Sequence, residues 1–545
     1  MRGLAVTLAV ACAAALAAAS LAAASTVFVV DGRGWGHGIG MSQWGAYGYA
    51  RHGWSYPHIL RHYYPGTTLA RTDAAPVRVL LAQDRVHATV GCAAPLTVAD
   101  GAGRSYHLRA GFYALGPRLK LPVAHKRVRV RPRRHHARHR VRFRRVTVRR
   151  ALPQPLTFDC PAAPLTLDGS AYHGLLVIHR WGGRLTVVNV VSLENYLRGV
   201  VGGEMPSRWN LAALEAQAVA ARSYVLATLK PDQAYDVYAD TRSQVYGGIA
   251  YESARTNLAV ARTAGRILTW HGRPAATFFF STSGGRTAAI RDVWPAARAL
   301  PYLRSVSDPY DVRSPHHRWG PLKVTPAELG APRARVVRVE RNASGRVAAV
   351  DVGGRRIPAT RVEARLRLPS TWFRIGELSL RAGVDRLVFG NAVTLRGSAV
   401  GVGTAALQAR TNGGRWRTIR RIRAGRFAVR VSPAGSTRYR IASRGIAVAP
   451  VAVAVAPRLH VELASAGRLD GLVSPRTSAA LAVARRTARG WRVVAHPRLD
   501  ARGRFSLPLR ARGGELRVTV AGNRALASAT THVQPRPSYL ASVGP

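Results

Sequence analysis

The segment GVVGGEMP, residues 199–206, restricts the fold of this chain more than any other stretch. An apolar helical pattern that begins after Ser192 meets the pair Gly202-Gly203, which favours a helix end. The helix cannot resume through Pro206, because proline lacks the amide hydrogen and clashes with the preceding turn. The sequence therefore predicts a helix over 193–201 that leaves Glu204 on a tight turn. A carboxylate held in this way is a candidate general acid.

Apolar patterning places a second helix and several strands around this turn. Asn210 is a candidate N-cap for a helix that runs to about Leu229. Short runs rich in Val, Leu and Ile predict strands, at 77–81, 175–178 and 185–191. The segment ATFFFSTSGGRT at 276–287 predicts a strand that ends in a Ser/Thr/Gly turn, a backbone that can approach a ligand closely.

The first 24 residues have the composition of a secretory signal peptide. Arg2 precedes an uninterrupted small and apolar run, and Ala22-Ala23-Ala24 is a small-residue cleavage site. A lipoprotein anchor at Cys12 fits less well, because the apolar stretch before it is very short. No later stretch reaches the ~18 apolar residues of a membrane helix. We expect a secreted or cell-wall-associated protein with no membrane span after cleavage, or an uncleaved leader that acts as an anchor.

Two cysteines remain after this cleavage, Cys92 and Cys160. An even number in an exported protein favours a disulfide, which would close the base of the most basic part of the chain. With only three cysteines in the whole sequence, a metal centre built from cysteines is excluded.

The chain is strongly basic, with 82 Lys and Arg against 26 Asp and Glu. Codon bias toward arginine explains part of this excess, and attraction to a polyanionic cell wall is the functional explanation. Nucleic acid is disfavoured as a partner because the protein is exported. The excess peaks at 125–150, which has thirteen Lys or Arg, four His and no acidic residue. Self-repulsion predicts a disordered or loosely extended insertion over 120–150, either a tolerated loop or a wall-binding tether.

Alternating Val and Arg punctuated by glycine replaces helical patterns toward the C-terminus. Two similar units are visible, in which Trp416 corresponds to Trp491. They predict tandem β-sandwich modules over 380–456 and 457–535. Modules of this kind are more often spacers or adhesive domains than enzymes.

Five separated motifs resemble the signature of the SpoIID/LytB family of cell-wall proteins. They are GRGWGHGIGMSQWGA at 32–46, VSLENYLRGVVGGEMP at 191–206, AQAVAARSY at 216–224, SQVYGG at 243–248 and FFSTSGGRT at 279–287. The resemblance spans most of 30–375 and implies an α+β fold, with a SpoIID-like mixed core of strands and a few helices followed by tandem all-β sandwich modules. The family's catalytic glutamate matches Glu204.

The expected domain order combines this resemblance with the composition. It is a signal peptide (1–24), a GHGxGMSQ-type segment that packs on the core (25–75), a strand-rich region (76–190), the SpoIID/LytB catalytic core (191–375), the two modules and a tail (536–545).

The sequence departs from the family pattern in two ways. The GHGxGMSQ-type segment follows the core in familiar members but precedes it here, like a circular permutation, which is sterically easy when the ends of a core lie close together. We therefore predict that residues 32–66 pack against the domain that carries Glu204. Some members also bind zinc through cysteines where this chain has Tyr238 and Ser243. We expect no metal and no cofactor.

The resemblance implies a lytic transglycosylase that cleaves peptidoglycan glycan strands. Glu204 would protonate the oxygen of the β-1,4 bond between N-acetylmuramic acid and N-acetylglucosamine, then accept a proton from the muramic acid 6-hydroxyl as it closes to a 1,6-anhydro end. Most glycoside hydrolases need a second carboxylate, whereas this mechanism uses one. Glu204 must start protonated, so we expect a pKa raised by an apolar pocket near Val200, Met205 and Trp209.

Other candidate site residues are weaker, and each has a structural alternative. Arg222 is a candidate ligand of sugar or lactyl oxygens, or else a helix-face salt bridge. His37 and Gln43 are candidates to line the saccharide groove, or else to bond a glycine-rich turn. Ser281, Ser283 and Gly284 are candidate donors to acetamido groups. Four aromatic residues are candidates for stacking on sugars, although more of them are expected in the core: Trp35, Trp44, Tyr63 and Tyr64.

Peptidoglycan glycan strands are the expected partner, with anionic wall polymers and an amidase as further candidates. Two other functions remain open, a non-catalytic enhancer of an amidase and a structural wall adhesin. A role in sporulation and a role in general wall remodelling fit the sequence equally well.

Overall fold

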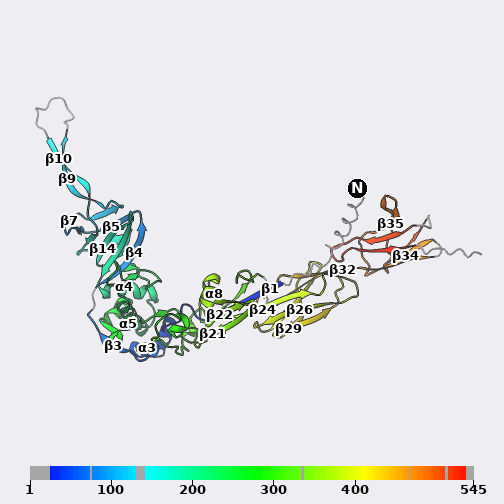
Figure 1. Ribbon diagram of the computed structural model, residues 1–545, viewed down its shortest axis with the longest axis horizontal. Helices are drawn as coiled ribbons and strands as arrows, with labels where there is room; N and C mark the ends of the chain where they lie inside the picture. The colour runs from blue at the N-terminus through cyan, green and yellow to red at the C-terminus, as the bar shows by residue number, and fades with distance from the viewer. Residues whose placement is uncertain are drawn as a thin grey trace, which may run out of the picture.

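The computed structural model describes residues 25–73, 76–130, 142–332, 337–464, 467–509 and 514–534. The predicted signal peptide and tail lie outside this part of the chain. Figure 1 shows an elongated row of units, with a strand hairpin at one end, a strand-rich region next to it, then a helical region, and β-rich units toward the other end. Within the described residues, no helix has the length and apolar character needed to cross a membrane.

The region over 76–190 consists of strands, as the sequence predicts. Two antiparallel sheets enclose one core that includes Val90, Phe158 and Leu176. The strands are β4 (Val77–Arg85), β5 (Ala88–Cys92), β6 (Leu96–Ala99), β7 (Ser105–Leu108), β8 (Gly111–Leu115), β11 (Leu156–Asp159), β12 (Leu165–Leu167), β13 (Ser170–Tyr172), β14 (Leu175–Trp181) and β15 (Arg184–Val191). The short parallel strand β16 (Val237–Tyr238) joins the edge of the larger sheet beside β4.

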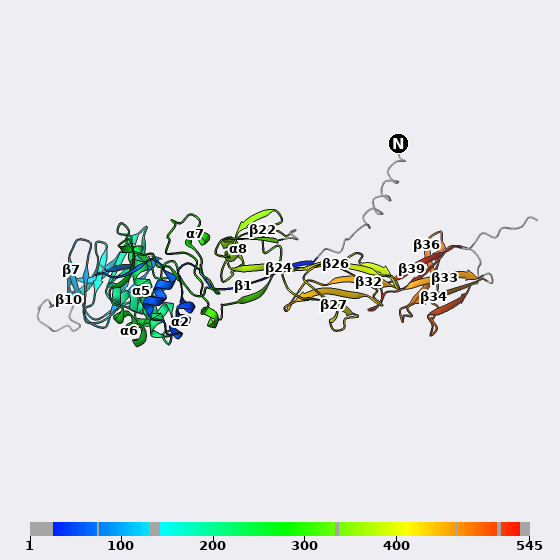
Figure 2. The same ribbon diagram turned by 90° about the horizontal axis from the view of Figure 1, so that it is seen from below.

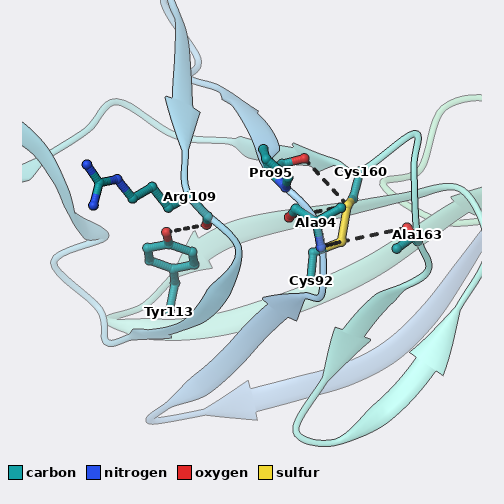
Figure 3. Close-up of a disulfide and its surroundings, with 7 residues drawn as sticks. All are labelled: Cys92, Ala94, Pro95, Arg109, Tyr113, Cys160 and Ala163. Carbon is teal, nitrogen blue, oxygen red and sulfur yellow. Dashed lines mark hydrogen bonds between the residues drawn. A yellow bond between two sulfur atoms is a disulfide. The ribbon is translucent and has the colours of Figure 1, made fainter.

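The expected pair of cysteines, Cys92 and Cys160, forms a disulfide in this region (Figure 3). The two residues are 68 positions apart, and both are buried in the core. A cross-link over a loop of this length removes much of the conformational freedom of the unfolded chain.

Replacing both cysteines by serine is therefore expected to lower the free energy of unfolding of this region by about 3 kcal/mol. Urea unfolding followed by circular dichroism measures the change. As a control, reductant is added to both proteins. The native protein should lose the same free energy of unfolding, and the serine variant should lose none, because it has no disulfide left to reduce.

The basic insertion differs from the prediction. Its described residues form an antiparallel hairpin of β9 (Lys120–Val130) and β10 (Arg142–Ala151), with residue pairs in register from Arg142 and Val130 to Val148 and Ala124 and a register shift before Arg150. Backbone hydrogen bonds of the ladder, together with the bond from Arg149 to the carbonyl of Lys120, hold the strands despite the like charges. Figure 1 shows this hairpin projecting from one end of the molecule. The disordered or loosely extended insertion predicted over 120–150 is thus corrected to an ordered hairpin for these two strands, while residues 131–141 lie outside the described part of the chain.

The helical region packs around α5. Its helices are α2 (Gln43–Arg51), α3 (Tyr56–Tyr63), α4 (Leu193–Glu204), α5 (Leu211–Ala227), α6 (Ala254–Arg262) and α7 (Ile290–Val293), with the 3₁₀ turns η1 (Gly248–Tyr251) and η2 (Asp311–Arg313). Its short strands are β2 (Met41–Ser42), β3 (Thr68–Arg71), β17 (Arg266–Trp270), β18 (Arg273–Pro274) and β19 (Phe279–Phe280). The small side chains of α5 are buried along most of its length, so α2, α3, α4 and α6 all contact it. Helices α2 and α3, which lie within residues 32–66, are thus in contact with α5 of this domain.

Strand β1 (Ser25–Gly32) corrects the expected domain boundaries. It lies between β20 (Trp319–Val324) and β24 (Phe373–Ala382) rather than on the helical core. Because successive side chains of a strand point to opposite faces, Phe28 and Val30 enter one core while Val27 and Val29 enter another. The first of these cores contains residues expected in the 191–375 domain, from β21 (Val337–Arg341), β22 (Val347–Val352), β23 (Arg355–Pro358) and α8 (Ala359–Leu366).

Two β-sandwiches follow in a row (Figure 2). The first encloses a core between a sheet that contains β1 and β24 and a sheet built on β27 and β30. Its other strands are β25 (Arg386–Val388), β26 (Val393–Val400), β28 (Arg417–Ile422), β29 (Gly425–Val431), β31 (Ile446–Ala447) and β32 (Val451–Ala456), with β27 at Ala405–Thr411 and β30 at Thr437–Ser443. The second has β33 (Arg458–Ala464), β34 (Arg468–Ser474), β35 (Leu481–Thr487), β36 (Gly490–Ala495), β37 (Arg504–Pro508), β38 (Leu516–Val520) and β39 (Ala529–Val533).

Candidate active site

Glu204 is the last residue of α4, and this placement corrects the predicted turn. The helix begins after Ser192, whose hydroxyl caps the amide of Asn195, and continues through Gly202 and Gly203. It ends at Glu204, and Met205 is its C-cap, directly before Pro206. The proline therefore stops the helix as predicted, whereas the glycine pair does not.

The glycines serve close packing instead. A methyl group added at Gly202 would lie 1.9 Å from the carbonyl oxygen of Tyr251, and one at Gly203 would lie 2.6 Å from the ring of Tyr251. A side chain at either position would thus push η1 away from α4. Because η1 follows the loop that contacts Glu204, this close approach fixes the loop beside the carboxylate.

Two donors hold the carboxylate of Glu204. The amide of Gln43 donates through Nε2 to Oε2 at 3.0 Å, and the backbone N–H of Val245 donates to Oε1 at 2.8 Å. Gln43 and Glu204 are 161 positions apart in the sequence, so the fold alone brings them together. Each carboxylate oxygen has one protein donor, and Glu204 itself is half-buried.

The Val245 donor is fixed by its two neighbours in the SQVYGG motif. Gln244 is buried, accepts from the hydroxyl of Tyr196 at 2.9 Å and donates to the carbonyl of Ala221 at 3.2 Å. The hydroxyl of Tyr246 donates to Asn189 at 2.7 Å. Since both flanking side chains are anchored in the core, the peptide between them has little freedom, and its N–H stays aimed at Glu204.

The Gln43 donor is fixed by the GHGIGMSQ segment. Gln43 is the first residue of α2, and the hydroxyl of Ser42 caps that helix by accepting from the amide of Gly45 at 3.1 Å. The strand β2 that precedes it pairs in parallel with β19. In addition, the amide of Trp44 donates to the carbonyl of Ser281 at 3.0 Å. These backbone bonds hold the start of α2 against the segment that follows β19.

Burial raises the pKa of Glu204, and the hydrogen bonds from Val245 and Gln43 oppose this shift. The direction agrees with the sequence prediction. Val200, Met205 and Trp209 are buried, and the ring of Trp209 stacks on Tyr47 with centroids 4.6 Å apart. A carboxylic acid that keeps its proton to a higher pH than usual is suited to donate it.

His37 and Ser281 lie on elements next to Gln43. His37 accepts from the amide of Ile39 through Nδ1 at 3.0 Å, which is the glycine-turn bond considered as its alternative role. Burial and the charge of Arg346 lower the pKa of His37 to about 4. His37 is therefore neutral at physiological pH and packs among the rings of Phe280 and Trp294. Ser281 is half-buried and is joined through its carbonyl to Trp44.

Three predicted ligands have structural partners instead. Arg222 is fully buried and forms two bonds to Glu194, from Nε at 2.9 Å and from Nη2 at 2.7 Å. Its Nη1 donates to the carbonyl of Arg266 at 3.0 Å. The hydroxyl of Ser283 and the amide of Gly284 both donate to Asp311. Arg222 is thus a salt-bridge residue with no exposed surface for a sugar, and the two donors of the 283–284 turn are already satisfied.

Two acidic residues, Asp308 and Asp311, lie fully buried near the start of α2 and escaped the sequence analysis. Tyr63 donates to Asp308 at 2.9 Å, and His317 lies 2.7 Å from Asp311. Burial and the neighbouring charge of Asp311 raise the pKa of Asp308 to about 7. No motif marks these two residues, because their partners come from distant parts of the chain. Val245 was missed for a related reason, since its contribution is a backbone amide that any residue could supply.

Of the predicted aromatic residues, Tyr63 and Tyr64 are fully buried and belong to the core. Trp35 is 49% exposed and packs edge-on against His316. Trp44 packs on Trp209 with centroids 4.8 Å apart.

Metal ligands are not gathered anywhere in the described ranges, which hold no group of three or more His, Cys, Asp or Glu side chains able to bind an ion. At the positions where some family members have cysteines, the hydroxyl of Ser243 accepts from the backbone amide of Tyr238 at 3.1 Å. This hydrogen bond closes the loop locally.

Residues 182–270 match the family model described as stage II sporulation protein, SpoIID. The chain contains a SpoIID domain. The matched residues include Glu204 and Val245, whereas Gln43 lies outside them.

The SpoIID domain is also similar to curated proteins over part of their length. Stage II sporulation protein D of Bacillus subtilis (strain 168) is 36% identical over 148 residues, which cover 24% of this chain and 43% of that protein. An amidase enhancer of the same organism is 40% identical over 118 residues, 21% of this chain and 15% of the enhancer. The chain thus spans less than half the length of either relative. A two-domain fibronectin type III segment of chicken tenascin is similar over 28% of this chain and 97% of the segment, with 14% identity and a TM-score of 0.19, a level that assigns no fold.

The bond from Gln43 into the SpoIID domain leads to a prediction about pH. Replacing Gln43 by leucine removes a donor that favours the charged carboxylate, so the pKa of Glu204 rises further. If the chain cleaves wall glycan with the protonated acid as its active form, the alkaline limb of the pH profile of that cleavage moves to higher pH. A limb that stays in place or moves to lower pH would contradict this. Measuring kcat from pH 5 to 9 for both proteins tests it.

Proposed function

We propose that the SpoIID domain of this chain cleaves peptidoglycan glycan strands as a lytic transglycosylase, with Glu204 as its single acid and base. The observation that carries this proposal is the environment of Glu204. Among the described residues, the groups that act on its pKa are its own burial, the amide of Val245 and the side chain of Gln43, none of which is a carboxylate. A single carboxyl group whose pKa is raised by burial lacks the second carboxylate that most glycoside hydrolases use.

The chemistry needs only that carboxyl group. Protonated Glu204 donates its proton to the glycosidic oxygen as the bond to muramic acid C1 breaks, and positive charge develops on that sugar. The resulting carboxylate is stabilised by Gln43 and Val245. It then takes the proton of the muramic acid 6-hydroxyl, whose oxygen bonds to C1 and leaves a 1,6-anhydro end. Glu204 finishes protonated and ready for the next cleavage.

Mass spectrometry of the products tests the proposal. Residues 25–545 are incubated with intact peptidoglycan and, in parallel, with peptidoglycan stripped of its stem peptides. Anhydro-muramic ends would support transglycosylation and show which substrate is preferred. Reducing ends would mean hydrolysis with water as acceptor.

The similarity to an amidase enhancer favours one second candidate, a wall-binding protein that stimulates a partner amidase. An enhancer should produce neither anhydro-muramic ends nor reducing ends. It should instead speed the release of stem peptides when purified amidase is present. The Glu204→Gln variant separates the two functions, since an enhancer would keep its effect.

The adhesin alternative is tested by truncation, and the structure decides where to cut. Removing residues from 380 onward would cut through β24, which pairs with β1. Removing 457–545 leaves that pairing intact. An enzyme should retain turnover after this cut, whereas an adhesin built on the second sandwich should lose its wall binding.

A further inference from the structure

A cavity of about 480 Å³ lies at the end of β1 and the starts of β20 and β24, and Glu204 is not among the residues that line it. We call it the arginine pocket, after five of its lining residues that come from distant parts of the chain. These are Arg33, Arg318, Arg341, Arg374 and Arg444. The indoles of Trp319 and Trp372 form apolar parts of its wall.

The positive charge of the arginine pocket is poorly balanced. Asp31 is the one carboxylate in its lining, and it is already paired with both Arg374 and Arg444. The guanidinium of Arg341 donates to the backbone carbonyls of Gly345 at 2.8 Å and Phe373 at 3.0 Å. Arg33 and Arg318 are exposed, and neither side chain has a carboxylate partner within the described part of the chain. Two guanidinium forks are therefore open to a ligand.

A sixth arginine lies behind the wall of the pocket. Arg346 is fully buried, and none of its three guanidinium nitrogens has a hydrogen-bond partner among the described residues. Its Cζ lies 5.7 Å from the ring centroid of Trp372, the same distance as that of Arg33. Burial lowers the pKa of Arg346 to about 10, so it stays charged at neutral pH. The charge of Glu363 acts on Arg346, but Glu363 forms no hydrogen bond with it among the described residues. A buried cation without a hydrogen-bond partner next to the pocket increases the attraction for an anion, because the protein interior screens charge weakly.

We propose that the arginine pocket binds an anionic polymer chain that carries phosphate or carboxylate groups on a sugar or polyol backbone. Guanidinium groups bind both kinds of oxyanion through paired N–H donors, and indole walls suit the carbon faces of such a backbone. The assignment of this polymer to a cell wall rests on the proposed function. Its anionic character does not rest on that function, because it follows from the residues of the pocket alone. A second contact of this kind would hold the protein on the wall while Glu204 acts on glycan.

Binding of the full chain to three defined polymers tests the proposal by isothermal titration calorimetry. They are poly(glycerol phosphate), polygalacturonate and uncharged dextran. The first two distinguish phosphate from carboxylate, and dextran measures binding without charge. No cleavage of glycan is involved, so failure here and failure of the transglycosylase proposal are distinguishable.

The test variant is Arg33→Gln with Arg318→Gln. Its matched control is Arg420→Gln with Arg421→Gln, two exposed residues of β28 whose replacement changes the net charge by the same amount. We expect the pocket variant to weaken binding of at least one anionic polymer by tenfold or more and the control by less than twofold. Equal losses in both variants would show a non-specific field and overturn the proposal, as would a wild-type protein that binds neither anionic polymer. Unchanged thermal unfolding of both variants excludes a folding effect.

Discussion

Replacing Glu204 by glutamine is expected to reduce the release of anhydro-muramic ends at least a hundredfold, within the ~10²–10⁴-fold that general acid–base assistance supplies. Glutamine has nearly the same shape and can still accept from the amide of Val245, but it has no proton to donate to the glycosidic oxygen. Its NH₂ group would face the NH₂ of Gln43, whose amide must rotate to accept from it. Quantifying anhydro ends by mass spectrometry under single-turnover conditions measures the effect.

Glu215→Gln is the matched control. Burial also raises the pKa of Glu215, which lies on α5 and is 3.9 Å from Arg262, but no motif assigns it a role in the chemistry. This variant should retain wild-type activity. If Glu204→Gln retains activity as well, the carboxyl group of Glu204 is not the acid and the proposed mechanism fails.

Replacing Arg222 by methionine is expected to lower the free energy of unfolding by about 3 kcal/mol, the low end for breaking a buried ion pair. Methionine preserves much of the apolar packing but loses the two bonds to Glu194 and the bond to the carbonyl of Arg266. The cost stays at the low end because the Glu194 side chain is 36% exposed and can be hydrated. Urea unfolding measures the loss.

Arg262→Met provides the comparison, because the Arg262 side chain is 59% exposed and its pair with Glu215 is long. An exposed pair contributes less than about 1 kcal/mol. The folded Arg222→Met protein should keep the wild-type KM for glycan strands. A raised KM with unchanged stability would instead return Arg222 to the role of a substrate ligand that the family motif suggests.

The fold was predictable wherever the signal is local. Ser192 and Asn210 cap the two helices as expected, because a side-chain oxygen one turn from an apolar periodic run is a short-range feature. The end of α4 was not predictable in this way. Whether Gly202 ends a helix or makes room for Tyr251 depends on a residue 49 positions later, and sequence spacing does not show that contact. The β9–β10 hairpin was not predicted, because the density of positive charge in both strands indicated self-repulsion and disorder. The backbone ladder between them forms despite that charge.

The candidate site shows the same limit. The glutamate itself follows from its motif, and the packing of residues 32–66 follows from the order of the motifs. The groups that set the chemistry of Glu204 depend on tertiary structure. They are the backbone amide of Val245 and the side-chain amide of Gln43, which is 161 positions from Glu204 in the sequence. Arg222 shows the opposite case, because a residue in a family motif can be kept for an ion pair in the core rather than for a ligand.

The pairing of β1 has a consequence for the order in which the protein is made. Gly32 and Trp319 face each other across the β1–β20 ladder, so residues 33–318 form one long insertion between two neighbouring strands. β1 leaves the ribosome before this insertion, while β20 and β24, its partners on either side, follow it. Until they arrive, the apolar residues on both faces of β1 have nothing to pack against and its edges are unpaired, which makes it prone to aggregation. The insertion must therefore fold early enough to bring its own ends together, and β1 is the segment that a chaperone would need to shield.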